Sequence, residues 1–199
     1  HRRRSSFLVA AIAAVTCAFV LLSALSAGIQ HTLIDTATTL TTGHLNVGGF
    51  FKVTSGQAAP VVADYAALES LVRREVPELE FLVHRGRGFG KLVSDNDSIQ
   101  AGISGIDIDR EPQIQRVLDV YQGKLADLSR PNSLLVFEQQ AKRLDIQVGD
   151  AVTITATTSR GAANTLDCRV VAIARDVGLL SSFNVLISSA SLRALYQLK

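Results

Sequence analysis

An uncharged apolar stretch, residues 7–29, limits what this chain can fold into more than any other feature. Its 23 residues read FLVAAIAAVTCAFVLLSALSAGI, and eleven of them are Leu, Ile, Val or Phe. As a helix rising about 1.5 Å per residue, the stretch would be about 34 Å long, which is enough to cross a hydrocarbon core of about 30 Å. Its apolar side chains favour insertion by about 3 to 7 kcal/mol in total. We therefore predict a basic lead-in and transmembrane helix over residues 1–29.

Three arginines, Arg2 to Arg4, stand directly before this stretch. Positive charges beside a membrane helix tend to stay cytoplasmic, so we expect a cytoplasmic N-terminus, a cell (inner) membrane location and an extracytoplasmic or periplasmic main domain. The main alternative is a cleaved signal peptide, because residues 24–27 (ALSA) are small and suit cleavage. The apolar run exceeds the about 7 to 15 residues usual in signal peptides, which favours a retained helix. Both interpretations place the globular part outside the cytoplasm.

Composition limits the remainder of the chain. Of the 199 residues, 170 follow the apolar stretch, which suffices for one sizeable domain or two small lobes. The net charge of +2 is accounted for by the three leading arginines, so nothing indicates a nucleic-acid partner. Cys17 lies in the predicted membrane helix and Cys168 in a predicted strand, so we expect no disulfide. The sequence contains no Met, so we expect a processed product or a piece of a longer protein.

The predicted membrane helix carries small residues at every fourth position, namely Ala10, Ala14 and Ala18. Such a face lets a second helix approach closely, although a high general alanine content is the plainer explanation. The helical spacing continues beyond the membrane through Leu33, Ala37 and Leu40, and Gly43 can end it. Residues 30–43 are therefore predicted to form a stalk.

The pattern after residue 43 mixes strands and helices. Alternating apolar residues predict strands at residues 45–53, 79–83, 92–93, 99–103, 133–137, 152–156, 166–172 and 185–187. Helical spacing predicts helices at residues 64–76, capped by Asp64, at 112–121 and 137–144, and a last one capped by Ser188 or Ser189. Residues 54–60 and 159–164 are predicted loops, the second within a hairpin. The class is α+β, as one domain over residues 44–199 or as two lobes divided near 104–111 or near 130–131.

A tight turn is predicted at Val148, Gly149 and Asp150. Gly accepts a positive φ, and Asp can accept hydrogen bonds from the local backbone. Before this turn, Ala141 and Leu144 share one helical face, which we expect to pack on the sheet.

Residues 85–91, RGRGFGK, come nearest to a ligand-binding motif. The segment lacks the GxxxxGK[ST] spacing of a phosphate-binding loop and runs into a strand rather than a helix. We predict a flexible hairpin tip with solvated arginines. Its Arg85, Arg87 and Phe89 are candidates for contact with a partner protein.

No other group of residues predicts catalysis or metal binding. The internal histidines are far apart in the sequence, at His31, His44 and His84. Residues 95–97 fit a polar turn better than a calcium loop, and Asp107 and Asp109 have no evident partner for acid–base chemistry. No Gly-x-Ser-x-Gly is present. We expect no catalytic residue, no metal, no cofactor and no enzyme activity.

Several segments resemble the permease subunits of type VII ABC transporters, the group of MacB, LolC/LolE and FtsX-like proteins. The run RRRSSFLVAAIAAVTCAFVLLSALSAGIQHTL is similar to their first transmembrane helix, and GHLNV is similar to the first strand of their MacB-like periplasmic core domain. AGISGIDIDREPQI resembles a strand and Gly-x-Asp turn in mid-domain. The most specific segment, LLVFEQQAKRLDIQVGDAVTI, is similar to a block of hydrophobic strand, Ala-x-x-Leu, Val-Gly-Asp and strand. CRVVAIARDVGLLSSFNVLISSASLRALY resembles the strand, loop and capped helix that follow.

The resemblance implies a fold, a function and partners. It implies a MacB-like periplasmic core domain at residues 44–199, truncated at its C-terminal end, with three further membrane helices after it. It implies a permease subunit in membrane lipid, paired with a second permease subunit and with a cytoplasmic ATPase subunit that binds the ATP. The domain would couple ATP hydrolysis to substrate extrusion or lipoprotein release. The sequence departs from the family at two places. Phe137 and Glu138 stand where the family usually has a Gly after the short strand. Asp145 lies near the position of a second usual Gly, before the Val-Gly-Asp segment.

Two functions of other classes remain open from the sequence. The chain could be a single-pass, membrane-anchored sensor or binding domain. It could also be a secreted enzyme released by cleavage near Ala27.

Overall fold

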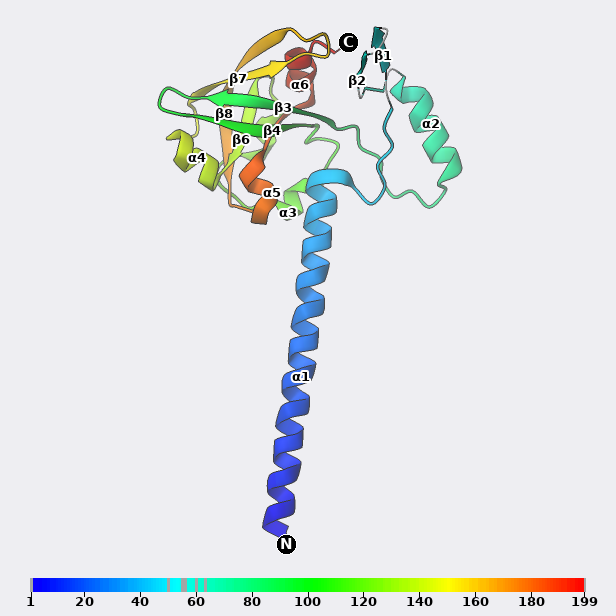
Figure 1. The fold of residues 1–199 in the computed structure, drawn as a ribbon, viewed down its shortest axis with the longest axis vertical. Coiled ribbons are helices and arrows are strands. Elements are labelled where there is room, and N and C mark those ends of the chain that lie inside the picture. Colours follow the sequence, from blue (N-terminus) through cyan, green and yellow to red (C-terminus); the bar gives the residue numbers. More distant parts are fainter. Residues whose placement is uncertain (1, 50, 55–56, 60, 63, 199) are drawn as a thin grey trace. The chain divides into compact units, whose positions relative to one another are not determined.

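The computed structural model describes residues 2–49, 51–54, 57–59, 61–62 and 64–198. The chain divides into two compact units, His1–Leu45 and Asn46–Lys199, which are called here the helical unit and the sheet unit. Figure 1 shows the elements of both units in chain order.

The helical unit is one long helix. The α-helix α1 (Arg2–Ala37) continues into one π-helical turn, η1 (Thr38–Thr42). The predicted end at Gly43 is confirmed, because this residue has φ 68° and its N–H donates to the carbonyl of Thr38 at 2.8 Å. Threonine is a weak helix former, and here Thr32 and Thr38 donate their hydroxyls to carbonyls four residues earlier, Gly28 and Ile34. The helical pattern predicted beyond the apolar stretch is therefore present.

The sheet unit mixes nine strands and several short helices among its described residues. Its strands are β1 (Phe51–Thr54), β2 (Gln57–Ala59), β3 (Gly86–Val93), β4 (Ser98–Ile106), β5 (Val120–Gly123), β6 (Ser133–Phe137), β7 (Ala151–Thr157), β8 (Ala163–Ala174) and β9 (Asn184–Ser188). Its helices are α2 (Tyr65–Glu75), α3 (Ile114–Val117), the 3-10 turn η2 (Leu125–Ser129), α4 (Glu138–Leu144), α5 (Gly178–Phe183) and α6 (Ser189–Tyr196). The predicted α+β class with an N-terminal apolar helix is confirmed.

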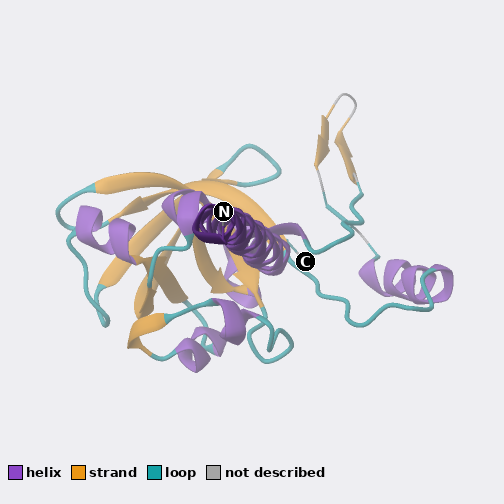
Figure 2. Ribbon diagram, turned by 90° about the horizontal axis from the view of Figure 1, so that it is seen from below, coloured by secondary structure: helices purple, strands orange, loops and turns teal. Residues whose placement is uncertain are grey.

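Strands β3 to β9 form one sheet that closes on itself. The strand order is β5-β8-β6-β9-β4-β3-β7, and β7 also pairs with β8. Six strands therefore make a closed ring, and β5 pairs with β8 outside it. The strands curve around a common interior in Figure 2. Closure removes the free edges that an open sheet would expose.

The interior of the ring is the main apolar core. Its buried side chains alternate along the strands, and they include Leu92, Ala101, Ile103, Leu134, Val136, Val152, Ile154, Cys168, Val170, Val185 and Ile187. Helix α4 lies against β4, β6 and β8, and it buries Ala141 and Leu144 in this core as predicted. Helix α6 lies against β3, β4, β7, β8 and β9 and contributes Leu192 and Leu195.

Part of the outer side of the ring is covered as well. The 3-10 turn η2 lies against β6, β8 and β9, and its Leu128 is fully buried. Ile106, Ile108 and Ile114, from the end of β4 to the start of α3, are also buried.

Several local predictions are confirmed. The Asp64 carboxylate accepts from the N–H of Ala67 at 3.0 Å and caps α2, and Ser188 caps α6 by accepting from the N–H of Ser191. The hairpin of β7 and β8 pairs Val152 with Cys168.

Other predicted elements are wrong. Residues 44–49 are not a strand, and β1 begins only at Phe51; the glycines at 48 and 49 weaken strand pairing there. The predicted loop at 54–60 contains β2, which pairs Ala59 with Phe51. Residues 79–83 pair with none of the described strands and remain irregular in spite of their alternation.

The helix predicted at residues 112–121 is limited to α3. Residues 120–123 extend as β5 instead, because they pair with β8 opposite Ala172 to Ala174. This sheet pairing overrides the helical spacing of the apolar residues. Residues 104–111 and 130–131 were the two predicted lobe boundaries. The strands before and after each segment belong to the same sheet, because β4 pairs with β9 and β6 pairs with β8 and β9.

Candidate functional site

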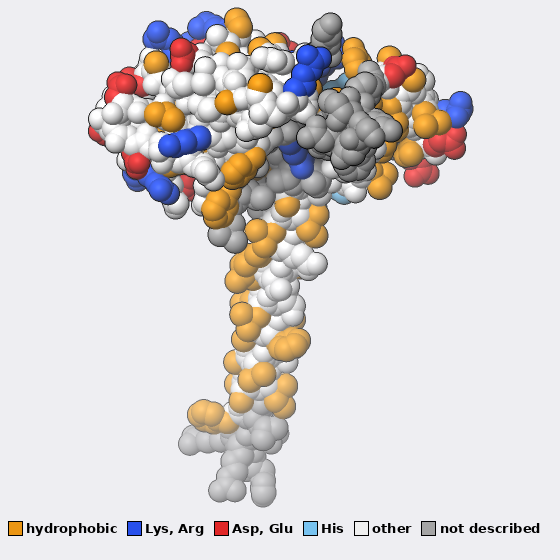
Figure 3. Space-filling model, turned by 45° about the horizontal axis from the view of Figure 1, so that its top comes forward, with side chains coloured by type: hydrophobic (Ala, Val, Ile, Leu, Met, Phe, Trp, Pro, Cys, Tyr) orange, Lys and Arg blue, Asp and Glu red, His pale blue; other side chains and the backbone are white. Residues whose placement is uncertain are grey.

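Helix α1 exposes large apolar side chains around its whole circumference. Phe7, Val15 and Phe19 are 81%, 69% and 72% exposed. Figure 3 shows hydrophobic side chains along the helix. The stretch Val9–Leu40 contains an 18-residue segment with a mean hydropathy of 2.3 and is long and apolar enough to cross a membrane. A signal sequence near an N-terminus meets the same criteria.

The predicted packing face of this helix lies on its exposed surface. Ala10, Ala14 and Ala18 are exposed and share one side of α1, because residues four apart lie one above the other. Their role in contact with a second helix stays a prediction.

The glycine-rich segment is not a hairpin tip. Residues 86–93 are the strand β3, which pairs with β4 along its whole length and with β7 over its second half. The reversal of the chain lies later, where the N–H of Ser94 donates to the carbonyl of Asp97 at 3.0 Å. The prediction of a flexible loop is therefore wrong, while a contact with a partner through these residues stays a prediction.

The spacing of the glycines has a packing cause. A Cβ at Gly86 or Gly105 would clash with Leu192, and a Cβ at Gly88 would clash with the Tyr196 ring. These glycines therefore let α6 approach the inner side of β3 and β4. The Tyr196 hydroxyl donates to the carbonyl of Phe89 at 2.9 Å, and burial raises the pKa of this phenol.

The side chains between the glycines point to the outer side of β3. Arg87, Phe89 and Lys91 are exposed, while Gly90 and Leu92 are buried. Among residues 64–198, neither Arg87 nor Lys91 has an ion pair or a side-chain hydrogen bond. Burial, together with the charge of Arg85, lowers the pKa of the Arg87 guanidinium.

Arg85 has a different environment from Arg87. It is 11% exposed, and both its Nε and one terminal nitrogen donate to the Glu111 carboxylate, the first at 2.7 Å. Glu111 is 2% exposed and also accepts from the N–H of Asp107. Arg85 is thus committed to a buried ion pair, which the sequence alone did not reveal because its partner lies 26 residues away.

The predicted turn at residues 148–150 forms as expected. Gly149 has φ 105°, and the Asp150 carboxylate accepts from the N–H of Gln147 at 2.7 Å. The Gly149 carbonyl accepts from Arg169 on β8 at 2.8 Å, which joins the turn to the sheet. These contacts support a structural role for the turn.

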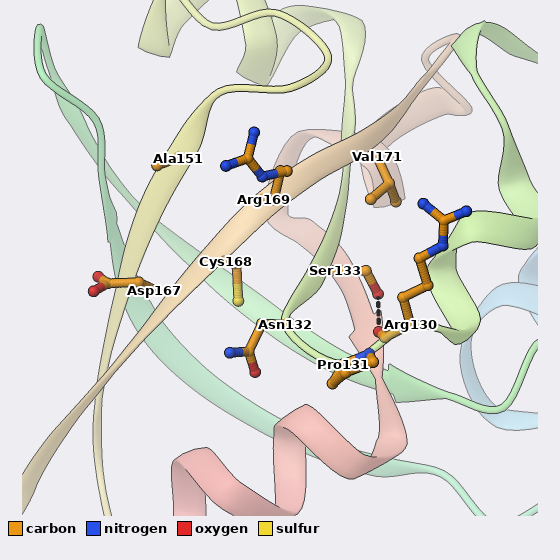
Figure 4. A pocket seen from close by; sticks show the side chains of 9 residues that line it. All are labelled: Arg130, Pro131, Asn132, Ser133, Ala151, Asp167, Cys168, Arg169 and Val171. Atoms are coloured by element: carbon orange, nitrogen blue, oxygen red, sulfur yellow. Dashed lines mark hydrogen bonds between the residues drawn. The ribbon is translucent and has the colours of Figure 1, made fainter.

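A hollow of about 330 Å³ opens beside β8 (Figure 4). Nine residues line it, namely Arg130, Pro131, Asn132, Ser133, Ala151, Asp167, Cys168, Arg169 and Val171. The Ser133 hydroxyl donates to the carbonyls of Leu128 and Arg130, and Asp167 accepts from the Thr153 hydroxyl.

The hollow holds no activated nucleophile among these residues. Burial raises the pKa of the Cys168 thiol from 9.0 to about 12, with a smaller contribution from Asp167. The thiol is therefore protonated at neutral pH, whereas nucleophilic cysteines need a lowered pKa. The sequence did not indicate this hollow.

The remaining candidates do not gather into a site. His84 lies 3.3 Å from the Glu69 carboxylate and packs edge-on against Tyr65. Among the described residues, no three His, Cys, Asp or Glu side chains are placed to hold a metal ion. The residues around 95–97 form a turn held by the Ser94 hydroxyl, which accepts from the N–H of Asp97 at 3.1 Å.

Comparisons with known proteins give a distant structural likeness. No family model and no curated protein matches the chain. Among solved structures, the chain is similar to the extracellular domain of the noncanonic ABC-type transporter YknZ from Gram-positive bacteria, with 14% identity and a TM-score of 0.45. The match covers 65% of this chain and 64%, less than two thirds, of that one. A likeness at this level does not carry an argument about function.

Proposed function

We propose that the chain is part of a permease subunit of an ABC transporter of the MacB, LolC/LolE and FtsX-like group. In this proposal, α1 crosses the cell (inner) membrane with its N-terminus in the cytoplasm, and the sheet unit lies outside the cytoplasm. The exposed apolar surface of α1 supports membrane insertion, and the three arginines before it support this orientation.

One observation carries the family part of the proposal. The order that the resemblance implies is present in space: the buried strand β6, then α4 with Ala141 and Leu144 against the sheet, the turn at Gly149, and β7. The departure at Asp145 is accommodated, because this residue takes the left-handed conformation (φ 52°) that a glycine adopts most easily. The departure at Phe137 is also accommodated, because its side chain is only 2% exposed.

The proposed role of this chain is mechanical rather than chemical. ATP binds and is hydrolysed on a cytoplasmic partner subunit, a second permease subunit completes the transporter, and this chain holds no cofactor of its own. Motion of the membrane helices reaches the sheet unit through the last turns of α1. The sheet unit then moves or releases a substrate such as a lipoprotein, a peptide or a drug.

Purification of the native protein from its own membranes tests this proposal. The protein is tagged, solubilised in mild detergent and isolated, and its companions are identified by mass spectrometry. The proposal predicts a co-purifying ATP-binding cassette ATPase and ATP hydrolysis by the isolated complex. Isolation of the protein without any ATPase, from a gene that encodes one membrane span, would contradict it and would favour a single-pass sensor or binding domain.

A further inference from the structure

The outer side of β3 carries a row of three side chains that have no ion pair and no side-chain hydrogen bond within residues 64–198. Arg87, Phe89 and Lys91 occupy successive outward positions, so neighbours in the row are about 7 Å apart. Phe89 is 62% exposed, which is unusual for a phenylalanine in the middle of a paired strand. The row is therefore a surface feature that the packing of the sheet does not explain.

The backbone of a second residue with an exposed aromatic side chain, Phe183, lies near this row. Gly102 on β4 pairs with Phe89 on one side and with Asn184 on β9 on the other. A Cβ at Gly102 would clash with the Asn184 side-chain oxygen and would lie 3.3 Å from the carbonyl oxygen of Phe183, and Phe183 is 65% exposed. The Asn184 side chain therefore lies beside Gly102, between the segments that carry the two exposed phenylalanines.

The charge of this surface is positive. The Glu111 carboxylate is bound to Arg85, and among residues 64–198 neither Arg87 nor Lys91 has a carboxylate partner. The neighbours of Lys91 across the sheet are uncharged, namely Gln100 on β4 and Thr155 on β7. Partial burial and, to a smaller extent, the Arg85 charge disfavour the charged form of Arg87, whereas an anion placed beside it would favour that form.

The surface is also held in place before any partner arrives. β3 is paired with β4 along its whole length and with β7 from Gly90 to Val93, and the Phe89 carbonyl is bonded to Tyr196. A partner therefore cannot add a strand beside the second half of β3 and has to bind there through side chains. Exposed aromatic and arginine side chains on a rigid support are typical of the residues that dominate protein interfaces.

We infer that Arg87, Phe89 and Lys91, with the nearby Phe183, named here the Phe89 surface, bind an acidic segment of a partner protein that carries an aromatic or large aliphatic residue. A second copy of this surface would face it with the same charges, which disfavours self-association. An anionic membrane would gain only about 1 kcal/mol from each of the two cations, which is too little for stable binding. The inference rests on the sheet unit alone and is independent of the proposed transport function.

Peptide binding to the full chain in nanodiscs of zwitterionic lipid tests this inference. The probe is a fluorescent synthetic peptide in which glutamates flank two phenylalanines. One reference peptide has lysines in place of the glutamates, and another has alanines in place of the phenylalanines. We expect the acidic aromatic peptide to bind at least about tenfold more tightly than either reference, a difference of about 1.4 kcal/mol or more.

Matched substitutions assign the binding to the Phe89 surface. Phe89→Ala and Lys91→Glu should each weaken binding of the acidic aromatic peptide by about tenfold. Phe81→Ala and Arg160→Glu change an exposed phenylalanine and an exposed arginine elsewhere, so binding should be retained. Tyrosine fluorescence on heating verifies that all four variants fold.

Three results would overturn the inference. The first is equal binding of the acidic and the lysine peptides, or no binding of either. The second is preferential binding to vesicles with anionic lipid that Lys91→Glu abolishes, which would assign the surface to a membrane. The third is concentration-dependent dimerisation of the full chain that Phe89→Ala abolishes, which would assign it to a second copy.

Discussion

The Arg85 guanidinium donates two hydrogen bonds to the Glu111 carboxylate and so ties the start of β3 to the loop that follows β4. Both side chains are nearly removed from water, at 11% and 2% exposure. Removal of one member of such a pair leaves an uncompensated buried charge, which is more costly than the net gain from the pair.

Glu111→Gln is therefore expected to lower the free energy of unfolding by about 3 to 5 kcal/mol. All three tyrosines of the chain, Tyr65, Tyr121 and Tyr196, belong to the sheet unit, and the chain has no Trp. Urea unfolding followed by tyrosine fluorescence therefore reports on this unit. The control is Asp119→Asn, which breaks the exposed pair with Arg175 and should cost about 1 kcal/mol or less. Equal losses in the free energy of unfolding for the two substitutions would show that the Arg85–Glu111 pair stabilises the fold no more than an exposed ion pair does.

Gly90→Ala is expected to destabilise the sheet unit by about 1 to 3 kcal/mol, because its Cβ would lie 2.7 Å from the Thr155 carbonyl oxygen and 2.8 Å from Ile103 Cδ1. A carbonyl within a paired strand cannot move aside without distorting the ladder. Gly48→Ala is the matched control, since a Cβ there meets nothing within 4 Å. The same unfolding assay should give an unchanged or slightly higher stability for the control. An unaffected Gly90→Ala variant would mean that β3 and β7 are not paired as described.

The buried Cys168 thiol predicts a loss of stability in alkali. Its pKa is about 12 in the folded chain against 9.0 as the ordinary value, so between these values the folded state binds more protons than the unfolded state. The contribution of the Cys168 thiol to the free energy of unfolding is therefore complete below about pH 9. Above that pH the free energy of unfolding falls by up to about 1.4 kcal/mol per pH unit. The measurement is the unfolding free energy from pH 8 to about pH 10.5, with Cys168→Ala as reference. Identical slopes for the two proteins would contradict the burial of the thiol.

The alanine face of α1 predicts association with another copy of this helix. Ala14→Leu places a larger side chain on the face and should weaken self-association by about 1 to 2 kcal/mol. Thr16→Leu is the control, because residue 16 lies about 200° around the helix from residue 14. Energy transfer between labelled chains in liposomes measures the effect. Equal dimer fractions for both variants would remove the assigned role of Ala10, Ala14 and Ala18.

Local features were predictable from the sequence where a short segment determines them. Asp64 and Ser188 cap helices through contacts three residues away, and the turn at Gly149 needs only its own backbone geometry and Asp150. The apolar helix was predictable because its composition alone decides it. The pairing of β7 with β8 follows from two alternating runs joined by one short loop.

Features that depend on distant partners were not predictable. The alternation of residues 79–83 is strand-like, yet no described strand pairs with them. Tyr121 completes the helical spacing predicted for residues 112–121, but residues 120–123 become β5 because β8 lies beside them. The glycines of β3 indicated flexibility in sequence, but they serve the close approach of α6, which lies about a hundred residues later. The alternation of glycine with larger residues from 85 to 91 was the one signal that favoured a strand.

The most direct test of the account is the placement of the two ends of α1 relative to the membrane. The chain is expressed in its native membrane in a Cys17→Ala background, with one new cysteine at either Ser6 or the exposed Arg160. A membrane-impermeant maleimide is then added to spheroplasts before and after permeabilisation. We expect Arg160→Cys to be labelled at once and Ser6→Cys to be labelled only after permeabilisation. Labelling of Arg160→Cys only after permeabilisation, or release of the chain from the membrane without α1, would contradict it.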